Sequence, residues 1–378
     1  MMKILFFIES LEVGGAEKSL VTLLNLSDLE NHSVDLLMLK KGTFLSEVPS
    51  NVNCIFLKDL KPNLFQRVKY FFTKKIGQLH PSQHFWKIFK DDFPLFQKNY
   101  DVAIAYGQGF STYYVAEKVY AKKKFAWINT DYEATGYKSE FDFPFYNKFQ
   151  AIIAVSETVQ KSLLQLKYKI SKQIDIILIP DIVNTEEIFR KSEEEIETFD
   201  INIVNIVSVG RLVGEKNFQL AITTAKLLKS RNYNFKWQIV GNGIQYQFLQ
   251  NLIMENDLQE SVLLSGMKKN PYPYIRNCDI YVQTSKFEGL GLTVIEAKIL
   301  GKPVVSTNFP TAYQIIEDGE TGLICDMTPK SLADALEKLI KDKPLKNKFS
   351  KTEAKFYDQK KDESLGSFYS LLTENNKF

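Results

Sequence analysis

Two glutamates, Glu288 and Glu296, stand eight residues apart in the stretch KFEGLGLTVIEAKILGKPVV at residues 286–305. A glycine-rich turn follows the first glutamate, and apolar spacing predicts a helix over residues 292–300 that contains the second. The backbone N–H groups and the dipole at such a helix start attract anions. Two carboxylates beside an anion site suit a ligand with both phosphate and hydroxyl groups. Because exposed helices commonly carry glutamates, the alternative is a pair of surface acids.

Two cations form a second candidate group. The stretch VGRLVGEKN at residues 209–217 starts at the end of a predicted strand and leads into a predicted helix, which places Arg211 and Lys216 near the carboxyl edge of that strand. Arginine offers a fork that matches phosphate oxygens, and lysine offers a mobile point charge. The alternative is a pair of surface cations. The turn VGNG at residues 240–243 adds another strand end to the same edge.

Short apolar runs that alternate with helical patterns must position these groups. In the first half of the chain, strands are expected at residues 3–9, 34–40, 54–57, 102–105, 125–128, 152–155 and 176–179. In the second half they are expected at residues 203–209, 236–240, 262–264, 280–283 and 304–306. Strands that alternate with helices predict parallel sheets with helices on both faces. Residues 180–200 contain a proline and a run of acids, and predict a linker or hinge.

The fold class is therefore α/β, with two doubly wound domains that face each other across a cleft. We expect an N-terminal domain over residues 1–185 and a C-terminal domain over residues 186–356. The last segment, residues 357–378, has apolar residues at helical spacing and predicts an amphipathic helix that crosses back to the N-terminal domain and covers an apolar surface there. Ligands of such sheets bind beyond the carboxyl ends of the strands, where the glycine turns of this chain fall.

Composition limits the classes of partner. The 378 residues carry a net charge of +3, which is too small to indicate binding to nucleic acid. The three cysteines form no CxxC pattern, so a reduced, cytoplasmic setting is the simplest inference. The apolar run at residues 4–8 is too short for the core of a signal peptide, and no other run is long enough to span a membrane. We expect a soluble or at most peripheral protein.

Several motifs occur together in a characteristic order. They are G-R-x-x-x-x-K at 210–216, V-G-N-G at 240–243, S-G-x-x-x-N-P-Y-P-Y at 265–274, E-G-x-G-x-x-x-x-E-A at 288–297 and D-G-E-T-G at 318–322. V-G-G-A-E at 13–17 and A-V-S-E at 154–157 precede them. In this set the chain closely resembles the retaining glycosyltransferases of family 4, which have the GT-B fold. The resemblance covers nearly the whole chain and is strongest over residues 201–325.

The resemblance implies a role for each matching position. Arg211 and Lys216 resemble the cations that neutralise the diphosphate of a nucleotide sugar, with UDP as the expected nucleotide. Glu288 resembles the catalytic glutamate near the hydroxyls and the reacting carbon of the donor sugar, and Glu296 the one that holds the ribose hydroxyls. The donor-binding residues implied at the helix start and in the N-terminal loop are Gly289, Leu290, Gly291, Leu292, Thr293, Gly14 and Gly15.

The resemblance fails at one position. Many members of the family carry a histidine after a strand of the N-terminal domain, near the donor sugar, where this chain has Asn129. Asparagine can hydrogen-bond a hydroxyl group but cannot carry a positive charge. Three alternatives follow: Asn129 substitutes as the catalytic residue, Asp131 makes the sugar contact, or the activity is altered. No Asp-x-Asp motif occurs, so no metal site and no cofactor are expected.

Residues 58–98 are rich in lysines and aromatic residues and fit the alternation of strands and helices poorly. One interpretation is a peripheral contact with an anionic membrane at the inner face of the plasma membrane. The alternative is a solvated helix whose aromatic residues belong to the core.

The sequence thus predicts a retaining, metal-independent, hexosyltransferase-type enzyme of bacterial surface polysaccharide or glycoconjugate synthesis. It would transfer a sugar from a nucleotide sugar to a saccharide or polyprenyl-linked acceptor. The alternatives are a catalytically silent GT-B subunit that supports a partner transferase, and a nucleotide-sugar 2-epimerase.

Overall fold

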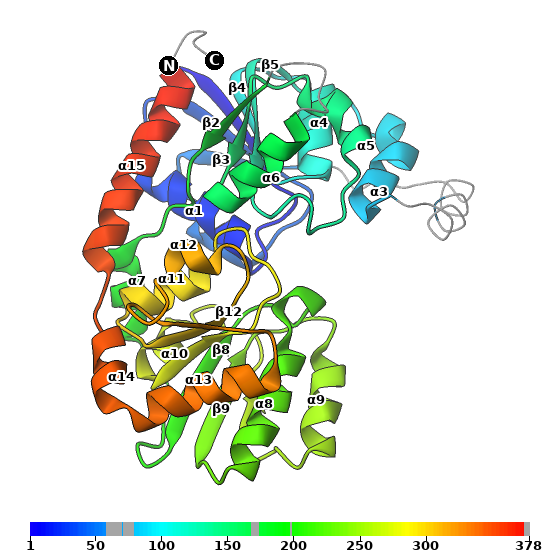
Figure 1. The fold of residues 1–378 in the computed structure, drawn as a ribbon. Coiled ribbons are helices and arrows are strands. Elements are labelled where there is room, and N and C mark those ends of the chain that lie inside the picture. Colours follow the sequence, from blue (N-terminus) through cyan, green and yellow to red (C-terminus); the bar gives the residue numbers. More distant parts are fainter. Residues whose placement is uncertain (58–69, 71–78, 168–173, 197–198, 374–378) are drawn as a thin grey trace. The chain divides into compact units, whose positions relative to one another are not determined.

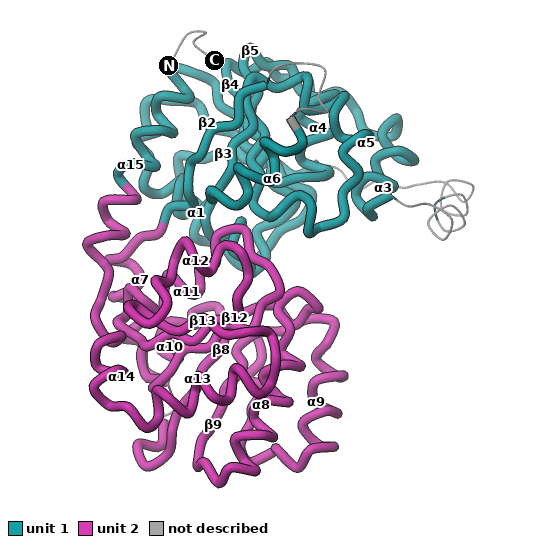
Figure 2. The backbone as a smooth tube through the Cα atoms, viewed as in Figure 1, with its two compact units in different colours: residues 1–182, 362–378 teal, residues 183–361 magenta. Residues whose placement is uncertain are grey.

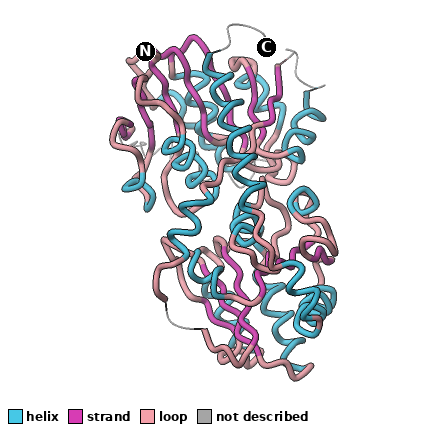
Figure 3. The backbone as a smooth tube through the Cα atoms, turned by 90° about the vertical axis from the view of Figure 1, so that its left-hand side faces the viewer, coloured by secondary structure: helices cyan, strands magenta, loops and turns pink. Residues whose placement is uncertain are grey.

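The computed structural model describes residues 1–57, 70, 79–167, 174–196 and 199–373. The chain forms two compact units, drawn in different colours in Figure 2. Unit 1 comprises Met1–Ile182 and Asp362–Phe378, and unit 2 comprises Val183–Lys361. Each unit has its own parallel sheet with helices packed along it (Figures 1 and 3).

Unit 1 is built on a sheet of seven described strands in the order β3-β2-β1-β4-β5-β6-β7, all parallel. The strands are β1 (Lys3–Phe7), β2 (Ser33–Met38), β3 (Val52–Phe56), β4 (Asn99–Tyr106), β5 (Tyr120–Ile128), β6 (Ala151–Ala154) and β7 (Asp175–Leu178). The helices are α1 (Gly15–Leu26), α3 (Pro81–Phe89), α4 (Phe110–Lys118), α5 (Ser139–Tyr146) and α6 (Glu157–Lys167), with short 3-10 turns η1 (Thr43–Glu47) and η2 (Lys90–Asp92). The chain leaves the middle of the sheet in both directions from β1 and β4, as a doubly wound sheet does.

Successive residues of a strand point to opposite faces, so a buried strand must be apolar on both. On β1, Phe7 packs edge-on against Phe110 and Tyr114 of α4, with ring centroids 5.8 and 5.1 Å apart. Its neighbour Phe6 contacts Phe368, at a centroid distance of 6.3 Å. The two faces of the sheet are therefore covered by different helices.

Phe368 belongs to the last helix, α15 (Ala354–Thr373), which begins in unit 2 and ends in unit 1. The Tyr369 hydroxyl accepts a hydrogen bond from the Asp28 backbone N–H at 2.7 Å, and Lys123 Nζ donates to the carbonyl of Leu372 at 3.4 Å. Leu371 and Leu372 are buried. These contacts confirm the prediction that the C-terminal helix returns to the N-terminal domain and covers an apolar surface.

Unit 2 has a sheet of six described parallel strands in the order β10-β9-β8-β11-β12-β13. The strands are β8 (Val204–Val209), β9 (Phe235–Val240), β10 (Val262–Leu264), β11 (Ile280–Gln283), β12 (Val304–Thr307) and β13 (Leu323–Cys325). The helical elements are α7 (Thr185–Ser192), η3 (Gly214–Lys216), α8 (Phe218–Ser230), α9 (Tyr246–Glu255), α10 (Tyr272–Asn277), α11 (Leu292–Ile299), α12 (Ala312–Ile315), α13 (Pro329–Lys341) and α14 (Lys343–Phe349).

Two separate apolar cores sandwich the sheet of unit 2. Ile206, Val282 and Val305 pack with side chains of α8, α9 and α13 on one face. Their strand neighbours Val207, Tyr281 and Val304 pack with α7, α10 and α11 on the other. This alternation within each strand explains why the strands appear in the sequence as continuous apolar runs.

The predicted α/β architecture of two doubly wound, Rossmann-like domains is confirmed. The sequence-based boundaries fall after residues 185 and 356, whereas the units change after residues 182 and 361. The prediction of a linker over residues 180–200 was wrong for residues 185–192, because α7 forms there. Its start is capped by Asn184 Oδ1, which accepts the Glu187 N–H at 3.1 Å, and Ile188 is buried.

The segment 58–98 is described only at residue 70 and from residue 79 onward. In this described part, Trp86, Phe89 and Phe93 are buried, and Trp86 stacks on Phe93 at a centroid distance of 5.8 Å. The alternative that assigns these aromatic residues to the core is therefore correct for Trp86 and Phe89 of α3 and for Phe93, which directly follows η2. Among the residues that the structure describes, no helix combines the length and the apolar character needed to cross a membrane.

A small polar network connects the centre of the unit 1 sheet to Asp181, near the end of the first chain segment of that unit. Ser19 Oγ of α1 donates to Asp181 Oδ1 at 2.6 Å and lies 2.7 Å from the hydroxyl of Tyr106, the last residue of β4. Ser19 has one proton, which it gives to the carboxylate, so the tyrosine must donate to the serine. Burial raises the pKa of Asp181 to about 7, while the hydrogen bond from Ser19 acts in the opposite direction.

We predict that Asp181→Asn stabilises the protein more at pH 8 than at pH 5. An unfolded aspartate loses its proton near pH 4, whereas Asp181 keeps it to about pH 7 in the folded state. The folded state therefore binds more protons over this window, and the contribution of Asp181 to stability falls as the pH rises. The difference in Tm between variant and wild type, measured by scanning fluorimetry, should grow from pH 5 to pH 8. A pH-independent difference, or the same trend in the control Asp91→Asn, would contradict the prediction.

Candidate functional site

The chemistry-bearing residues of unit 2 lie where the winding of its sheet reverses. β8 and β11 are neighbouring parallel strands, with Ile206 opposite Ile280 and Val207 opposite Tyr281. The chain leaves β8 toward β9 on one side, whereas β11 continues toward β12 on the other. The loops that follow the two strands therefore diverge. Doubly wound sheets bind their ligands in the crevice that such a divergence creates.

The loop after β8 carries both predicted cations and is braced by the turn after β9. The Gly210 N–H donates to the carbonyl of Val240 at 3.0 Å, and the Leu212 N–H to that of Asn242 at 2.9 Å. A Cβ atom on Gly241 would stand 1.8 Å from the Gly210 carbonyl oxygen, so only glycine allows this approach. The turn at residues 240–243 thus supports the loop that holds Arg211, whose side chain is exposed.

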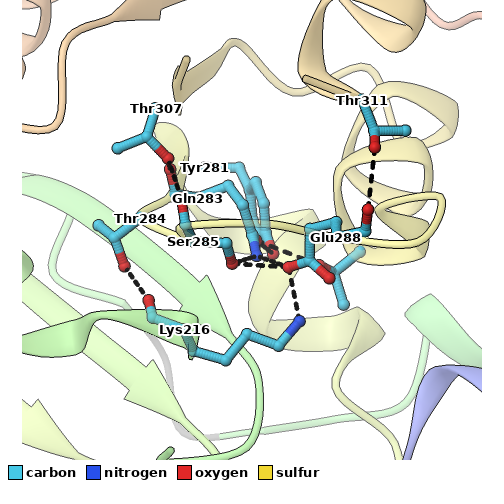
Figure 4. Close-up of polar contacts among 9 residues, drawn as sticks. Lys216, Tyr281, Gln283, Thr284, Ser285, Glu288, Thr307 and Thr311 are labelled. Carbon is cyan, nitrogen blue, oxygen red and sulfur yellow. Dashed lines mark hydrogen bonds and ion pairs between the residues drawn. The ribbon is translucent and has the colours of Figure 1, made fainter. Parts of the chain in front are cut away.

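Lys216 and Glu288 meet directly, as Figure 4 shows. Lys216 Nζ lies 2.6 Å from Glu288 Oε1, and both side chains are largely buried, with 18% and 12% exposed. The same oxygen accepts hydrogen bonds from Ser285 Oγ at 2.6 Å and from Gln283 Nε2 at 2.8 Å. A carboxylate with little access to water needs such partners, because an unpaired buried charge is costly. None of the described residues donates to Oε2.

The loop that carries Glu288 is also anchored through its backbone. Thr311 Oγ1 donates to the Glu288 carbonyl at 2.9 Å, and Thr307 Oγ1 at the end of β12 donates to the Ser285 carbonyl at 2.6 Å. Thr284 Oγ1 donates to the Lys216 carbonyl at 2.7 Å, which joins this loop to the loop after β8 (Figure 4). Threonine side chains thus fix the carboxylate and the lysine relative to the sheet.

The predicted anion site begins directly after Glu288. Gly289 and Leu290 continue the loop, and Gly291 has φ 86° and ψ 45°, a left-handed conformation that favours glycine. α11 then starts at Leu292, so the first backbone N–H groups of the helix, among them those of Leu292 and Thr293, have no partner within the helix. This start follows the carboxylate by four residues in sequence and belongs to the same loop.

Glu296 lies inside α11 and is only 3% exposed. Its Oε1 accepts a hydrogen bond from the Tyr272 hydroxyl of α10 at 3.3 Å. The structure confirms that the first glutamate lies in the loop and the second in the helix. The predicted contact of Glu296 with a ribose stays a prediction.

In unit 1 the predicted residues also lie at strand ends. Gly14 is the N-cap of α1 and Gly15 is its first residue, after β1, while Asn129 directly follows β5. Asn129 Oδ1 and Nδ2 are both buried, and neither has a hydrogen-bond partner among the described residues. Since a buried amide is usually satisfied, this side chain stands out as one that a ligand could pair.

The structure thus pairs Lys216 with Glu288, and Gln283 joins Glu288 to Thr293 Oγ1, which donates to Gln283 Oε1 at 3.2 Å. Arg211 lies on the same loop as Lys216. Gly14, Gly15 and Asn129 belong to the other unit, and their predicted part in the same site stays a prediction. Sequence reasoning missed five residues that hold the group together: Gln283, Thr284, Ser285, Thr307 and Thr311. The polar triplet Gln283-Thr284-Ser285 at the end of an apolar strand was a signal for part of this network.

A family model described as "Glycosyl transferases group 1" matches residues 190–356. This region contains the loop after β8, the loop after β11 and α11. It covers most of unit 2 but none of unit 1.

Several curated proteins are similar in sequence to this chain. The N-acetylgalactosamine-N,N'-diacetylbacillosaminyl-diphospho-undecaprenol 4-alpha-N-acetylgalactosaminyltransferase of Campylobacter jejuni is 33% identical over 57% of this chain and 58% of its own length. The capsular polysaccharide biosynthesis glycosyltransferase CapM of Staphylococcus aureus is 27% identical over 60% of this chain and 63% of its own. The chain thus spans little more than half the length of these relatives.

Solved structures match nearly the whole chain. TarM of S. aureus, in a complex that includes UDP, superposes with a TM-score of 0.71 and 15% identity over 99% of this chain and 100% of that one. Anabaena HepE with UDP and glucose has the same score, identity and coverage. Sucrose-phosphate synthase from Thermosynechococcus elongatus reaches a TM-score of 0.73, at 16% identity over 98% of both chains.

At this level of identity the superpositions establish the fold, and the match to the family model lies in the region that carries the Lys216–Glu288 group. Residues 190–356 are similar to the Glycosyl transferases group 1 model, and the chain as a whole has the two-domain GT-B fold.

Proposed function

We propose that this chain is a retaining glycosyltransferase that transfers a hexose-type sugar from a nucleotide sugar to a saccharide or lipid-linked acceptor. The observation that carries the proposal is the meeting of Lys216 and Glu288, at 2.6 Å, beside the start of α11. A cation, a carboxylate and unpaired helical N–H groups at one sheet edge suit a ligand that combines a diphosphate with sugar hydroxyls.

The cations act on the leaving group. When the sugar leaves, negative charge builds up on the oxygens of the nucleoside diphosphate, and fixed positive groups stabilise that charge in the transition state. Arg211, Lys216 and the N–H groups of residues 291–293 would fill this role. No metal ion is required in this scheme, because the protein itself supplies the positive charge.

Glu288 would bind the donor sugar. Three donors hold its Oε1, so Oε2 can accept a hydrogen bond from a sugar hydroxyl without releasing the others. Glu296 would hold the ribose hydroxyls, and Gly289 and Leu290 would carry the chain closely past the donor. When a diphosphate binds, Lys216 would contact the phosphate oxygens, either in addition to its contact with Glu288 or in place of it.

Unit 1 would bind the acceptor and would also contact the donor. Gly14 and Gly15 would allow the phosphates of the donor to approach the backbone at the start of α1. Asn129 would pair its amide with a sugar hydroxyl in place of the histidine of many family members. Retention then follows if the acceptor attacks from the face of the departing phosphate and a phosphate oxygen accepts its proton.

The relatives favour particular substrates. The Campylobacter jejuni enzyme is named for an undecaprenol diphosphate acceptor, CapM for capsular polysaccharide, and the TarM and HepE structures contain UDP. We therefore propose a UDP-sugar donor, and an acceptor used in bacterial surface polysaccharide or glycoconjugate synthesis on the cytoplasmic side of the membrane.

The first test is incubation of the protein with a panel of nucleotide sugars. We expect slow release of nucleoside diphosphate from one UDP-sugar, and a loss of about 10²- to 10³-fold in Glu288→Ala, because an interaction with the reacting sugar is removed. The matched control is Glu260→Ala, the same change at an exposed acid elsewhere in unit 2. Isomerisation of the sugar without release would indicate an epimerase instead. No turnover of any donor would indicate a silent subunit.

Removal of the two cations should weaken nucleotide binding. We expect Arg211→Ala combined with Lys216→Ala to raise the Kd for UDP by about 10²-fold, since each charge-assisted hydrogen bond contributes about 1.5–3 kcal/mol. Titration calorimetry measures the Kd directly. Lys226→Ala, which removes an exposed lysine of α8, is the control. An unchanged Kd in the double variant would refute the assignment of the diphosphate site.

We also propose a peripheral membrane contact through residues 58–98. In the described part of that segment the aromatic rings Trp86, Phe89 and Phe93 are buried, whereas Lys87 and Lys98 are exposed, so any contact there would be electrostatic. The protein should sediment with vesicles that contain anionic lipid and should be released as salt is raised. Equal sedimentation with neutral vesicles, or none with either kind, would contradict this contact.

A further inference from the structure

The side-chain amide of Gln283 has every hydrogen-bonding position occupied. Its Oε1 accepts from the Tyr281 hydroxyl at 2.9 Å and from Thr293 Oγ1 at 3.2 Å. Its Nε2 donates to Ser285 Oγ at 2.7 Å and to Glu288 Oε1 at 2.8 Å. Two acceptor lone pairs and two N–H donors are the full capacity of a primary amide, so these contacts saturate it.

The chemistry of the partners fixes which way the amide faces. The ionised carboxylate of Glu288 can only accept, so the nitrogen of Gln283 must point toward it. The hydroxyls of Tyr281 and Thr293 then donate to the oxygen on the other side. Gln283 is only 3% exposed and is the last residue of β11, so the amide is held on a rigid element (Figure 4).

This amide joins two parts of the site that the loop alone would leave independent. On one side is Glu288, which lies in the loop. On the other is Thr293, the second residue of α11, where the helix presents its first N–H groups. A single buried side chain therefore links the carboxylate to the start of the helix.

We propose that Gln283 is a positioning residue that aligns Glu288 with the diphosphate-binding start of α11. The proposal rests on the proposed function, in which Glu288 binds the donor sugar and α11 binds the phosphates. Gln283 itself does not touch the substrate. It acts by supplying one of the three donors to Glu288 Oε1 while its own position is fixed by Thr293 and Tyr281.

A length-matched variant separates positioning from packing. Gln283→Met keeps the length of the side chain and its burial but removes all four hydrogen bonds. We expect kcat to fall about 10- to 100-fold, because a hydrogen bond to a charged group is lost, while the Kd for UDP stays within about threefold. Gln238→Met, the same change two strands away in β9, should leave kcat unchanged. An unchanged kcat in Gln283→Met, or an equal loss of UDP affinity, would overturn the proposal.

Two further measurements keep the test decisive. If Gln283→Met does not fold, Thr293→Val removes the hydroxyl that contacts Gln283 Oε1 and the Tyr281 side chain, leaves the Gln283 amide and the backbone N–H in place, and should lower kcat about threefold or more. An unchanged kcat in Thr293→Val would then overturn the proposal.

If wild type turns over no donor, the proposed function fails and a crystal structure of Gln283→Met decides the positioning role by itself. The carboxylate of Glu288 should then leave its place between Lys216 and Ser285. A carboxylate that stays in that place would show that Gln283 does not position it.

Discussion

The arrangement of the candidate site in unit 2 depends on the pairing of the Glu288 carboxylate. A negative charge with only 12% of its side chain exposed must be paired, and one of its oxygens receives an ammonium, an amide and a hydroxyl from Lys216, Gln283 and Ser285. Each donor comes from a segment that must itself be held in place. The anchoring of these loops by Thr284, Thr307 and Thr311 follows from this requirement.

The order of strands explains why these groups meet. Lys216 and Glu288 are separated by 72 residues, yet β8 and β11 are adjacent and parallel, so the loops after them leave the same edge of the sheet. The reversal of winding between these strands keeps other connections out of the space beyond them. The same arrangement in unit 1 places Gly14 after β1 and Tyr106 at the end of β4, at its own reversal. The network of Ser19, Tyr106 and Asp181 uses that position.

The sequence predicted the alternation of strands and helices because buried parallel strands are apolar on both faces. It missed α7, whose polar surface hides a short apolar stripe, and β13, which has only three residues. Arg211, Lys216 and Glu288 were identified from residue type and family resemblance. Their direct pairing could not be predicted, since it depends on the adjacency of β8 and β11. The role of Gln283 was also hidden, because its contacts become evident only once the loop and α11 are placed together.

A crystal structure of the protein with an unreactive analogue of its nucleotide sugar tests the central claim most directly. The account predicts that the diphosphate lies within hydrogen-bonding distance of Arg211, Lys216 and the first N–H groups of α11, with a sugar hydroxyl on Glu288. A nucleotide bound with its diphosphate away from these groups, or a sugar that makes no contact with Glu288, would contradict it.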